Sequence, residues 1–257
     1  MKETFLKNKH NERQKREETT IILHPWSVSK VLLAGVLFLL VAHLITIYLL
    51  DSSHSQRLVH FLNGHFNLDS EGSIPAFFSA CIMLMASVIL FFIYRASTLM
   101  SKNSSNKYWL ILSCIFLFLS LDEATVIHEE LIMTLRERLF NRYQVDDLSG
   151  FLRYPWIIPY GLLVLVIGII FIKFVLSLNR KTKLLFIASG SIYIIGAIGF
   201  EMLGGYMIEN YGEGNYFIMC TTIEEVLEMC GLVGFIYGLL DYSSRLSLGF
   251  IISSKKL

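Results

Sequence analysis

Residues 31–50 read VLLAGVLFLLVAHLITIYLL, an apolar run without a single acidic or basic side chain other than His43. A helix needs about 20 such residues to cross the ~30 Å hydrocarbon core of a bilayer. Comparable runs recur at residues 74–94, 108–127, 156–176, 184–208 and 217–240. The sequence therefore predicts an all-α fold, a polytopic membrane helix bundle of about six transmembrane helices.

The composition supports a membrane protein and argues against other classes. Hydrophobic residues make up 54% of the chain and charged residues 17%, against roughly one quarter charged in soluble domains. The net charge of +1 leaves no single-sign patch that would gather phosphates, so nucleic acid is not expected as a partner. The four cysteines lie in apolar runs without a Cys-x-x-Cys pair, which is typical of small packing residues. The expected partner is the lipid bilayer.

Lys and Arg indicate the side of the membrane on which each link lies. They gather in residues 1–30, in the links 95–107 and 173–183, and in the C-terminal tail. Because short cytoplasmic loops are enriched in these residues, the pattern predicts that both termini are cytoplasmic. We therefore divide the chain into a charged cytoplasmic N-terminal segment (1–30), a six-helix transmembrane domain (31–242) and a cytoplasmic tail (243–257).

Two segments on the predicted outer side have helical features of their own. Residues 58–62 form a largely apolar group that would lie along the membrane interface as a short helix, and Asn63-Gly64 is typical of a turn. After the third span, residues 129–142 keep a helical spacing of Leu and Ile, which predicts that this helix continues past the membrane surface.

Acidic residues inside the spans are the feature that points to a function. A charged side chain at the bilayer centre costs about 2.5–3.5 kcal/mol on insertion scales, so such residues usually face the protein interior and belong to a site. The third and fifth spans run outward and carry their acids toward their C-terminal ends. The sixth runs inward and carries its acids toward its N-terminal end. All of these acids are therefore predicted to lie in the outer half of the membrane.

Helical phase at 100° per residue predicts which way these side chains point. In the third span one arc holds Asp122, Thr125, His128 and Glu129, with Glu123 to one side. In the sixth span two glutamates share one helix face with small residues, which are Thr221, Glu224, Glu228, Gly231 and Gly238. In the fifth span Glu201 likewise shares a face with Ser189, Ala197 and Gly205. Small residues permit close helix contact, so the acids should point where helices touch.

Carboxylates brought together without cations must take up protons, pair with cations or bind a metal ion. No Lys or Arg lies within these three spans. Carboxylate oxygen with one or two imidazoles suits Zn, Mn or Fe. The predicted ligands of a divalent metal ion are Asp122, Glu123, His128, Glu201, Glu224, Glu225 and Glu228. His128 and Glu129 are the candidate catalytic residues, and His43 is a weaker candidate ligand.

Helix capping is the competing interpretation of the same acids. Ser120-x-x-Glu123 and Thr222-x-x-Glu225 both fit the capping box at a helix start. Helices that began there would leave spans shorter than the bilayer requires, which argues against capping. His-x-x-x-His, His-Glu-x-x-His and Glu-x-x-His patterns are absent, so the metal site is predicted from a constellation of residues instead of a known motif.

Several short stretches together resemble a family of uncharacterised multi-pass bacterial inner-membrane proteins. They are Leu-Asp-Glu at 121–123 followed by His128-Glu-Glu, Gly-Phe-Glu-Met-Leu-Gly-Gly at 199–205, and Thr-x-Glu-Glu-x-Leu-Glu-Met-x-Gly at 222–231, with Phe66-Asn-Leu-Asp and Ile-Pro at 74–75. The resemblance implies the architecture and a bacterial plasma membrane location, and no established activity.

Three functions remain open from the sequence. The first is a metal-dependent membrane enzyme, such as a lipid hydrolase, whose site opens to the outer face. The second is a proton- or cation-coupled transporter that uses the same acids as a relay. The third is a non-catalytic membrane subunit. Because the cytoplasmic halves of the spans carry almost no ionisable residue, a one-sided site is favoured over a pathway across the membrane.

Overall fold

Each predicted span is helical in the computed structural model, which describes residues 18–21, 23–51, 56–101, 103–127, 149–154, 156–246 and 250–253. The α-helices are α2 (Pro25–Asp51), α3 (Gln56–Phe66), α4 (Ile74–Met100), α5 (Lys107–Thr125), α7 (Ile157–Ser177), α8 (Arg180–Ile194), α9 (Glu201–Tyr211) and α10 (Asn215–Arg245). Short helical turns are η1 (Ser104–Asn106), η2 (Gly150–Leu152) and the π-helix η3 (Ile195–Phe200), and two strands are β1 (Glu18–Ile21) and β2 (Phe250–Ser253). The predicted all-α bundle is confirmed.

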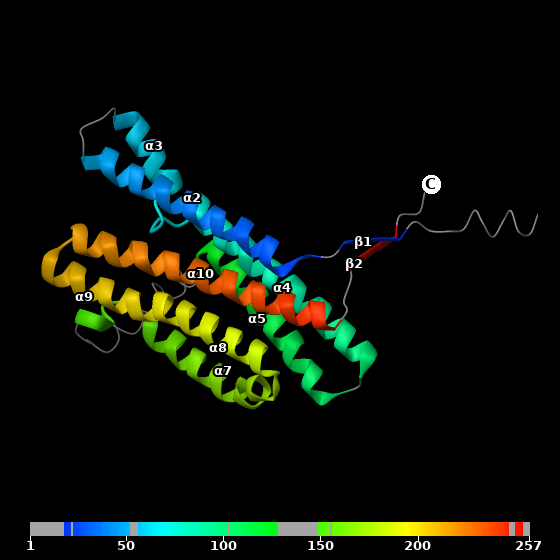
Figure 1. Ribbon diagram of the computed structural model, residues 1–257. Coiled ribbons are helices and arrows are strands. Elements are labelled where there is room, and N and C mark those ends of the chain that lie inside the picture. The colour runs from blue at the N-terminus through cyan, green and yellow to red at the C-terminus, as the bar shows by residue number, and fades with distance from the viewer. Residues whose placement is uncertain are drawn as a thin grey trace, which may run out of the picture.

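The number of crossings follows from the helices and from the two chain ends. Five stretches are long and apolar enough to span a membrane, namely Pro25–Leu50, Ile74–Met100, Ser104–Thr125, Ile157–Ser177 and Arg180–Tyr211. β1 precedes the first of them and pairs antiparallel with β2, which follows α10. The two ends of the helical domain therefore meet at one end of the bundle (Figure 1), which requires an even number of crossings. The 31-residue α10 carries three glutamates in its apolar part and is not among these five; as the predicted sixth span it would make the number even.

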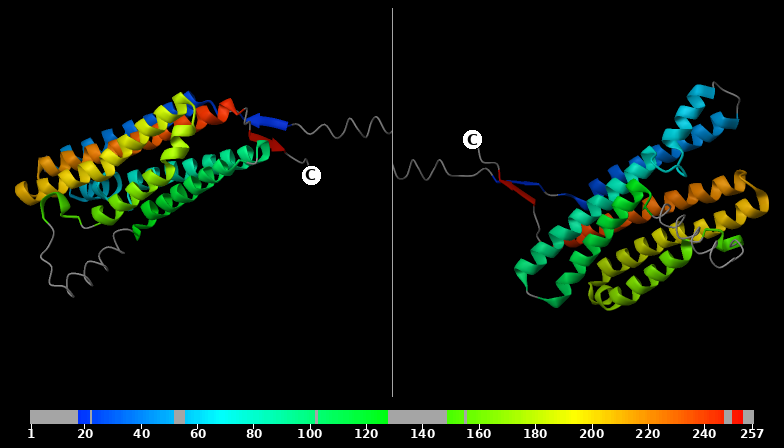
Figure 2. Two further views of the ribbon diagram at one scale, coloured as in Figure 1. Left: turned by 90° about the horizontal axis from the view of Figure 1, so that it is seen from below. Right: turned by 180° about the vertical axis from the view of Figure 1, so that it is seen from behind.

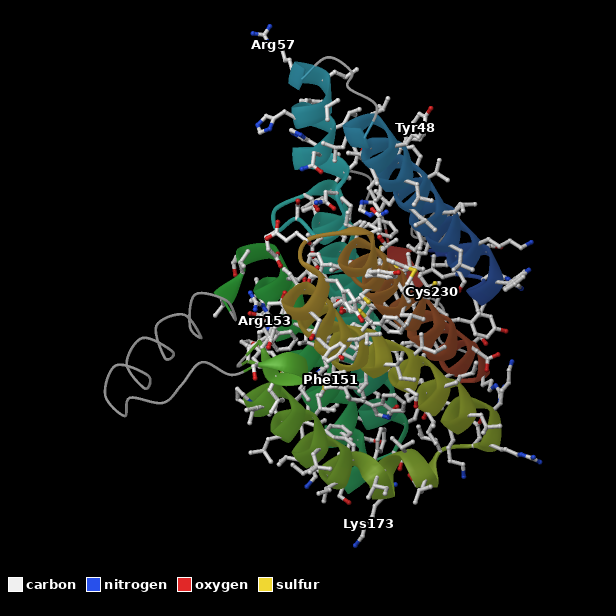
Figure 3. All side chains as sticks on the ribbon, turned by 90° about the vertical axis from the view of Figure 1, so that its left-hand side faces the viewer. Tyr48, Arg57, Phe151, Arg153, Lys173 and Cys230 are labelled. Atoms are coloured by element: carbon white, nitrogen blue, oxygen red, sulfur yellow. The ribbon has the colours of Figure 1, made fainter. Side chains whose placement is uncertain are left out.

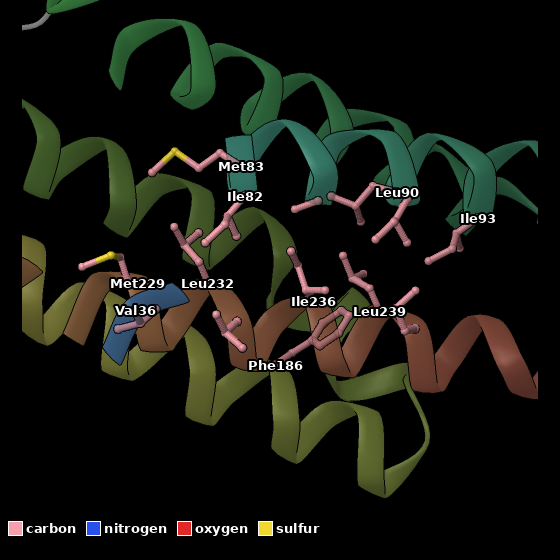
Figure 4. Close-up of a cluster of buried hydrophobic side chains, with 14 of the residues drawn as sticks. Val36, Ile82, Met83, Leu90, Ile93, Phe186, Met229, Leu232, Ile236 and Leu239 are labelled. Carbon is pink, nitrogen blue, oxygen red and sulfur yellow. The ribbon is translucent and has the colours of Figure 1, made fainter. Parts of the chain in front are cut away.

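Helix α10 forms the centre of the bundle. It packs against α8, α2, α9 and α4, and the α4–α5 hairpin lies behind the layer that α2, α10 and α8 form (Figure 2). Leu232, Ile236 and Leu239 of α10 face Ile82 and Leu90 of α4, and all five are buried (Figure 4). Because α10 has partners on several sides, most of its length is enclosed by protein instead of lipid. This enclosure allows α10 to carry acidic residues within the membrane.

Three hydroxyl hydrogen bonds link α4 to α5 at two levels. Ser87 Oγ donates to the Ser113 carbonyl oxygen at 2.8 Å, and Ser113 Oγ donates to the Ser87 carbonyl oxygen at 2.9 Å. Nearer the acids, Ser120 Oγ donates to the carbonyl oxygen of Ala80 at 2.8 Å. Small hydroxyl residues of this kind let membrane helices approach closely and bond across the interface. They fix the end of α5 from which the acidic residues project.

One local prediction on the outer side is wrong, and a second falls mostly on residues that the structure does not describe. We call the end of the bundle opposite β1 and β2 the outer end, as the basic residues predict. There, α3 is helical as expected, but Asn63 and Gly64 continue the helix instead of forming a turn. α5 ends at Thr125 because Val126 adopts the left-handed conformation, with φ of 57°, so the helix does not run on unbroken. Residues 129–142 lie outside the described part of the chain.

Candidate carboxylate site

The acidic residues of α5 and α10 lie inside continuous helices and are not helix caps. Ser120 is well inside α5, where its hydroxyl bonds to Ala80 of α4. Thr222 lies seven residues after the start of α10, and its Oγ1 donates to the carbonyl oxygen of Ile218 at 2.6 Å. Neither residue starts a helix, so the capping interpretation is wrong. The glutamates must be explained by what surrounds them in the bundle.

A local change of helix type brings the fifth span against α10. η3 is a π-helix between α8 and α9, and Glu201 begins α9 directly after it. A Cβ at Gly196 in η3 would come within 2.9 Å of the Glu224 carbonyl oxygen and 3.2 Å of the Glu228 backbone nitrogen. Only glycine permits this approach. π-turns within α-helices are rare and frequently occur at functional sites, and this one places Glu201 beside the glutamates of α10.

Glu201 of α9 and Glu224 of α10 lie side by side. Two adjacent carboxyl groups repel one another unless a proton or a cation lies between them. Glu224 is 7% exposed, and its Oε2 atom is buried without a hydrogen-bond partner among the residues that the structure describes. A buried polar atom of this kind is costly unless a ligand, an ion or water satisfies it. Glu224 is therefore the residue at which a bound species is most strongly indicated.

The deeper glutamate of α10 has a tyrosine partner. The Tyr193 side chain of α8 lies beside the Glu228 carboxyl group. Glu228 also interacts electrostatically with Glu123, Glu201 and Glu71. Glu225, one residue after Glu224, interacts with Glu228, Glu123, Glu71 and Asp69. These residues form what we call the carboxylate cluster; its members are Asp69, Glu71, Asp122, Glu123, Glu201, Glu224, Glu225 and Glu228.

On α5 the structure reverses the roles that helical phase predicts. Glu123, expected to lie to one side, is the α5 acid that interacts with Glu225 and Glu228. Asp122 is 5% exposed and accepts a hydrogen bond from the Tyr160 hydroxyl of α7, at 3.3 Å from Oδ2. Thr125, expected on the acidic face, is exposed and bonds to the Leu121 carbonyl oxygen. Asp122 therefore faces α7 and belongs to the cluster through its interaction with Glu123.

His43 has both ring nitrogens occupied by the protein. The Leu68 backbone N–H donates to Nδ1 at 3.1 Å, and Nε2 lies 2.9 Å from Thr222 Oγ1. Because Thr222 already donates to Ile218, its oxygen accepts from Nε2–H. The imidazole is therefore neutral, with its proton on Nε2. His43 ties α2 to α10 and to the loop before α4, and no ring nitrogen is left for a metal ion.

Exposed acids and a tyrosine lie at the outer end of the cluster. Asp69 and Glu71 are exposed in the loop between α3 and α4. Tyr154, between η2 and α7, has its pKa raised to about 12, first by burial and then by the negative charges of Glu201 and Asp69, against the opposing charge of Arg153. Figure 3 shows Arg153 beside α9 at this end. A cation approaching from the outer end would therefore meet negative charge before it reaches Glu224.

The predicted metal ligands are only partly described. Glu123, Glu201, Glu224, Glu225 and Glu228 are brought together as set out above. His128 and Glu129 lie outside the described residues, so their predicted roles stay predictions. Across the described ranges, no three His, Cys, Asp or Glu side chains form a group that could hold a metal ion. A metal ion would therefore require the carboxylates to draw together, or a ligand from the part of the chain that is not described.

Comparison with protein families matches most of this chain to a single domain. The family model is a domain of unknown function, DUF8692, and the match covers residues 31–242. The chain belongs to the DUF8692 family. The matched residues include all helices from α3 to α9, most of α2 and α10, and every member of the carboxylate cluster. No curated protein and no solved structure matches the chain. The family thus gives the extent of the domain, and the site has to be interpreted from its own residues.

Sequence reasoning missed the tyrosines of the DUF8692 site. Tyr193 lies four residues after Ser189 and eight before Glu201, on the face already assigned to the helix contact. The tyrosine hydroxyl on this face was the one feature of the sequence that could have suggested a partner for Glu228. Tyr154 and Tyr160 stand at the start of the fourth predicted span, where aromatic residues usually mark only the membrane interface. Their contacts with the cluster depend on how α7 packs beside α5, which the order of residues does not show.

Proposed function

We propose that the carboxylate cluster binds a divalent metal ion (Zn, Mn or Fe) taken up from the outer end, as the centre of a membrane-embedded enzyme. The observation that carries the proposal is the buried Glu224 Oε2 atom without a hydrogen-bond partner among the described residues, beside Glu201 and Glu228. No Lys or Arg occurs between residues 184 and 244 to neutralise these glutamates from their own helices. A divalent ion would supply that missing positive charge.

Proton exchange gives such a site a way to fill. A proton or a cation can relieve the repulsion between the adjacent carboxyl groups of Glu201 and Glu224, so a cation entering the pair would displace a proton. Glu228, beside Tyr193, is the next carboxylate available as a ligand. Metal uptake should therefore release protons and weaken as the pH falls. The exposed Asp69 and Glu71 favour the approach of cations from the outer side.

Hydrolysis of a lipid is the reaction class we assign to this centre. A bound metal ion can lower the pKa of a coordinated water to about 7 and polarise an ester or phosphoryl oxygen. A site in the outer half of the membrane is reached by a lipid from the adjoining leaflet. We assign His128 as ligand or base, with Glu129 beside it as the second catalytic candidate. The resemblance of the sequence motifs supports a location in a bacterial plasma membrane.

Metal content is the test of this proposal. Purified wild-type protein should carry near-stoichiometric transition metal when measured by inorganic mass spectrometry, and Glu224→Gln and Glu228→Gln should lose it while remaining folded. Glu213→Gln is the matched control, because Glu213 is exposed in the turn before α10 and outside the cluster. Metal-dependent release of a fatty acid or headgroup from bilayer lipids would then establish the reaction. Metal-free wild-type protein, after purification without chelators, would refute metal binding.

Proton-coupled transport is the second candidate, and one observation favours it. Adjacent carboxyl groups such as those of Glu201 and Glu224 can share a proton, which the cluster could bind and release without a metal ion. In vesicles, a transporter would show proton or cation flux that Glu224→Gln abolishes. On the inner side of Glu228, however, α10 continues with Met229, Gly231 and Leu232, which are buried and cannot relay a proton. This one-sidedness is why we place the enzyme first.

A further inference from the structure

A second polar cluster lies at the opposite end of the bundle, far from the carboxylates. Trp26 of α2 packs edge-on against Tyr237 of α10, with ring centroids 6.4 Å apart. Lys30 Nζ lies 5.2 Å from the centre of the Trp26 ring, and Lys181 Nζ of α8 lies 5.7 Å from the centre of the Tyr237 ring. Two lysines thus flank an aromatic pair, and the four residues come from three helices, α2, α8 and α10.

The charge in this cluster is not balanced by the described protein. Asp241 of α10 accepts a bond from Lys181 Nζ at 2.5 Å and is paired with Arg245 at 2.8 Å. Arg245 also donates to Asn179 at 3.2 Å. Three cations, Lys30, Lys181 and Arg245, therefore meet one carboxylate, which leaves a net charge of +2. Lys30 and Lys181 are exposed, so an anion can reach both ammonium groups.

An apolar stripe on α10 leads from the aromatic pair toward the middle of the membrane. Tyr237, Gly234, Cys230 and Ile223 recur at helical spacing on one face and are each half-buried, although their neighbours in α10 are mostly buried. Figure 3 shows Cys230 on this face of α10, close to α2. α10 contacts α2 on one side and α8 on the other. The stripe therefore lies between the two helices that supply Lys30 and Lys181.

We propose that Trp26, Lys30, Tyr237 and Lys181 bind the phosphate headgroup of an anionic phospholipid from the leaflet nearest the chain ends, with an acyl chain along the α10 stripe. Tryptophan and tyrosine are suited to the headgroup level, where one end of the ring is apolar and the other polar. Basic clusters between transmembrane helices at a membrane surface bind anionic lipid headgroups. Both halves of a phospholipid are matched, the phosphate by the excess positive charge and the hydrocarbon by the apolar stripe.

Lipid selectivity of the purified full-length protein tests this site. Native mass spectrometry in detergent, with equal amounts of phosphatidylglycerol and phosphatidylcholine, should show preferential retention of phosphatidylglycerol by the wild type. Lys30→Gln should lower that preference about fivefold, as expected for one lysine at a charged lipid surface, and Trp26→Ala should also lower it. Lys30→Arg should keep the preference, because it retains the charge.

The control is another lysine near the same end of the bundle. Lys173 is exposed on α7 and points away from the other helices (Figure 3), so Lys173→Gln should leave lipid selectivity unchanged. An equal loss in Lys173→Gln and Lys30→Gln would show a diffuse surface effect and overturn the proposal. Absence of any preference in the wild type would overturn it as well. Displacement of phosphatidylglycerol by an equal concentration of inorganic phosphate would show an anion site that does not recognise lipid, and would also refute it.

Discussion

His43 Nε2 lies 2.9 Å from Thr222 Oγ1, which joins the first span to the last at the depth of the carboxylate cluster. On the other side of the ring, the Leu68 N–H donates to Nδ1, so the loop that carries Asp69 is held to the same histidine. His43 is 2% exposed. A residue that first suggests a metal ligand is therefore a neutral structural connection, and it positions the acids without touching a ligand itself.

Replacing His43 should reduce stability and spare the site's metal content. In His43→Leu the Leu68 N–H loses its acceptor in a buried position, which costs about 1–3 kcal/mol. The change is measured by unfolding in mixed detergent micelles, with metal content determined on the fraction that remains folded. His24→Leu, at an exposed position before α2, is the control for replacing a histidine. Loss of metal from folded His43→Leu protein, with stability unchanged, would show that the hydrogen-bond assignment is wrong.

Tyr193 and Glu228 should behave as a coupled pair. Tyr193→Phe removes only the hydroxyl, which lies beside the Glu228 carboxyl group, and we expect a loss of about 1–3 kcal/mol in unfolding free energy. Glu228→Gln alters the same contact from the other side. A double-mutant cycle should therefore give a coupling energy of about 0.5–3 kcal/mol, as contacting residues do. Simple additivity of the two single effects would mean that the hydroxyl does not hold the carboxyl group.

The close approach of η3 to α10 can be tested by replacing a glycine at the contact and a second glycine away from it. In Gly196→Ala the new Cβ would come within 2.9 Å of the Glu224 carbonyl oxygen, so the helices must move apart. We expect a loss of about 1–3 kcal/mol from this overpacking, together with weaker metal binding. Gly190→Ala, in α8, has nothing within 4 Å of its new Cβ and is the matched control. Equal effects in both variants would contradict the packing argument.

Much of the fold could be predicted because length and hydropathy determine the spans. The predicted run at 74–94 begins where α4 begins, at Ile74, and the run at 156–176 differs from α7 by one residue at each end. The π-helix η3 was not predictable, because its extra residue per turn is selected by contact with α10 at Gly196. Local sequence preference does not distinguish it from an ordinary helical turn.

The candidate site was predictable in its depth and less so in its geometry. Placing the acids in the outer half needs only the alternating direction of the spans. Choosing between Asp122 and Glu123 needs the position of α10 relative to α5, which a phase calculation on one helix cannot supply. The same holds for Tyr160, which reaches Asp122 from α7. Residue order therefore identified the kind of chemistry, and tertiary packing decided which side chains meet.

Tyr154 gives the cluster a measurable dependence on alkaline pH. Burial and the charges of Glu201 and Asp69 raise its pKa from 10.0 to about 12, so the folded state holds the phenol proton more tightly than the unfolded chain. The stability associated with this proton is full below pH 10 and is lost as the pH rises toward 12. The melting temperature of the wild type, relative to Tyr154→Phe, should therefore fall across that interval. The melting-temperature curve of Tyr48→Phe, at a 70% exposed position, should run parallel to that of the wild type.

A second variant tests the source of the pKa shift. Because Glu201 contributes to the shift, Glu201→Gln should make the fall in melting temperature shallower. Parallel curves for the wild type and Tyr154→Phe would show that the charges of the cluster do not act on Tyr154.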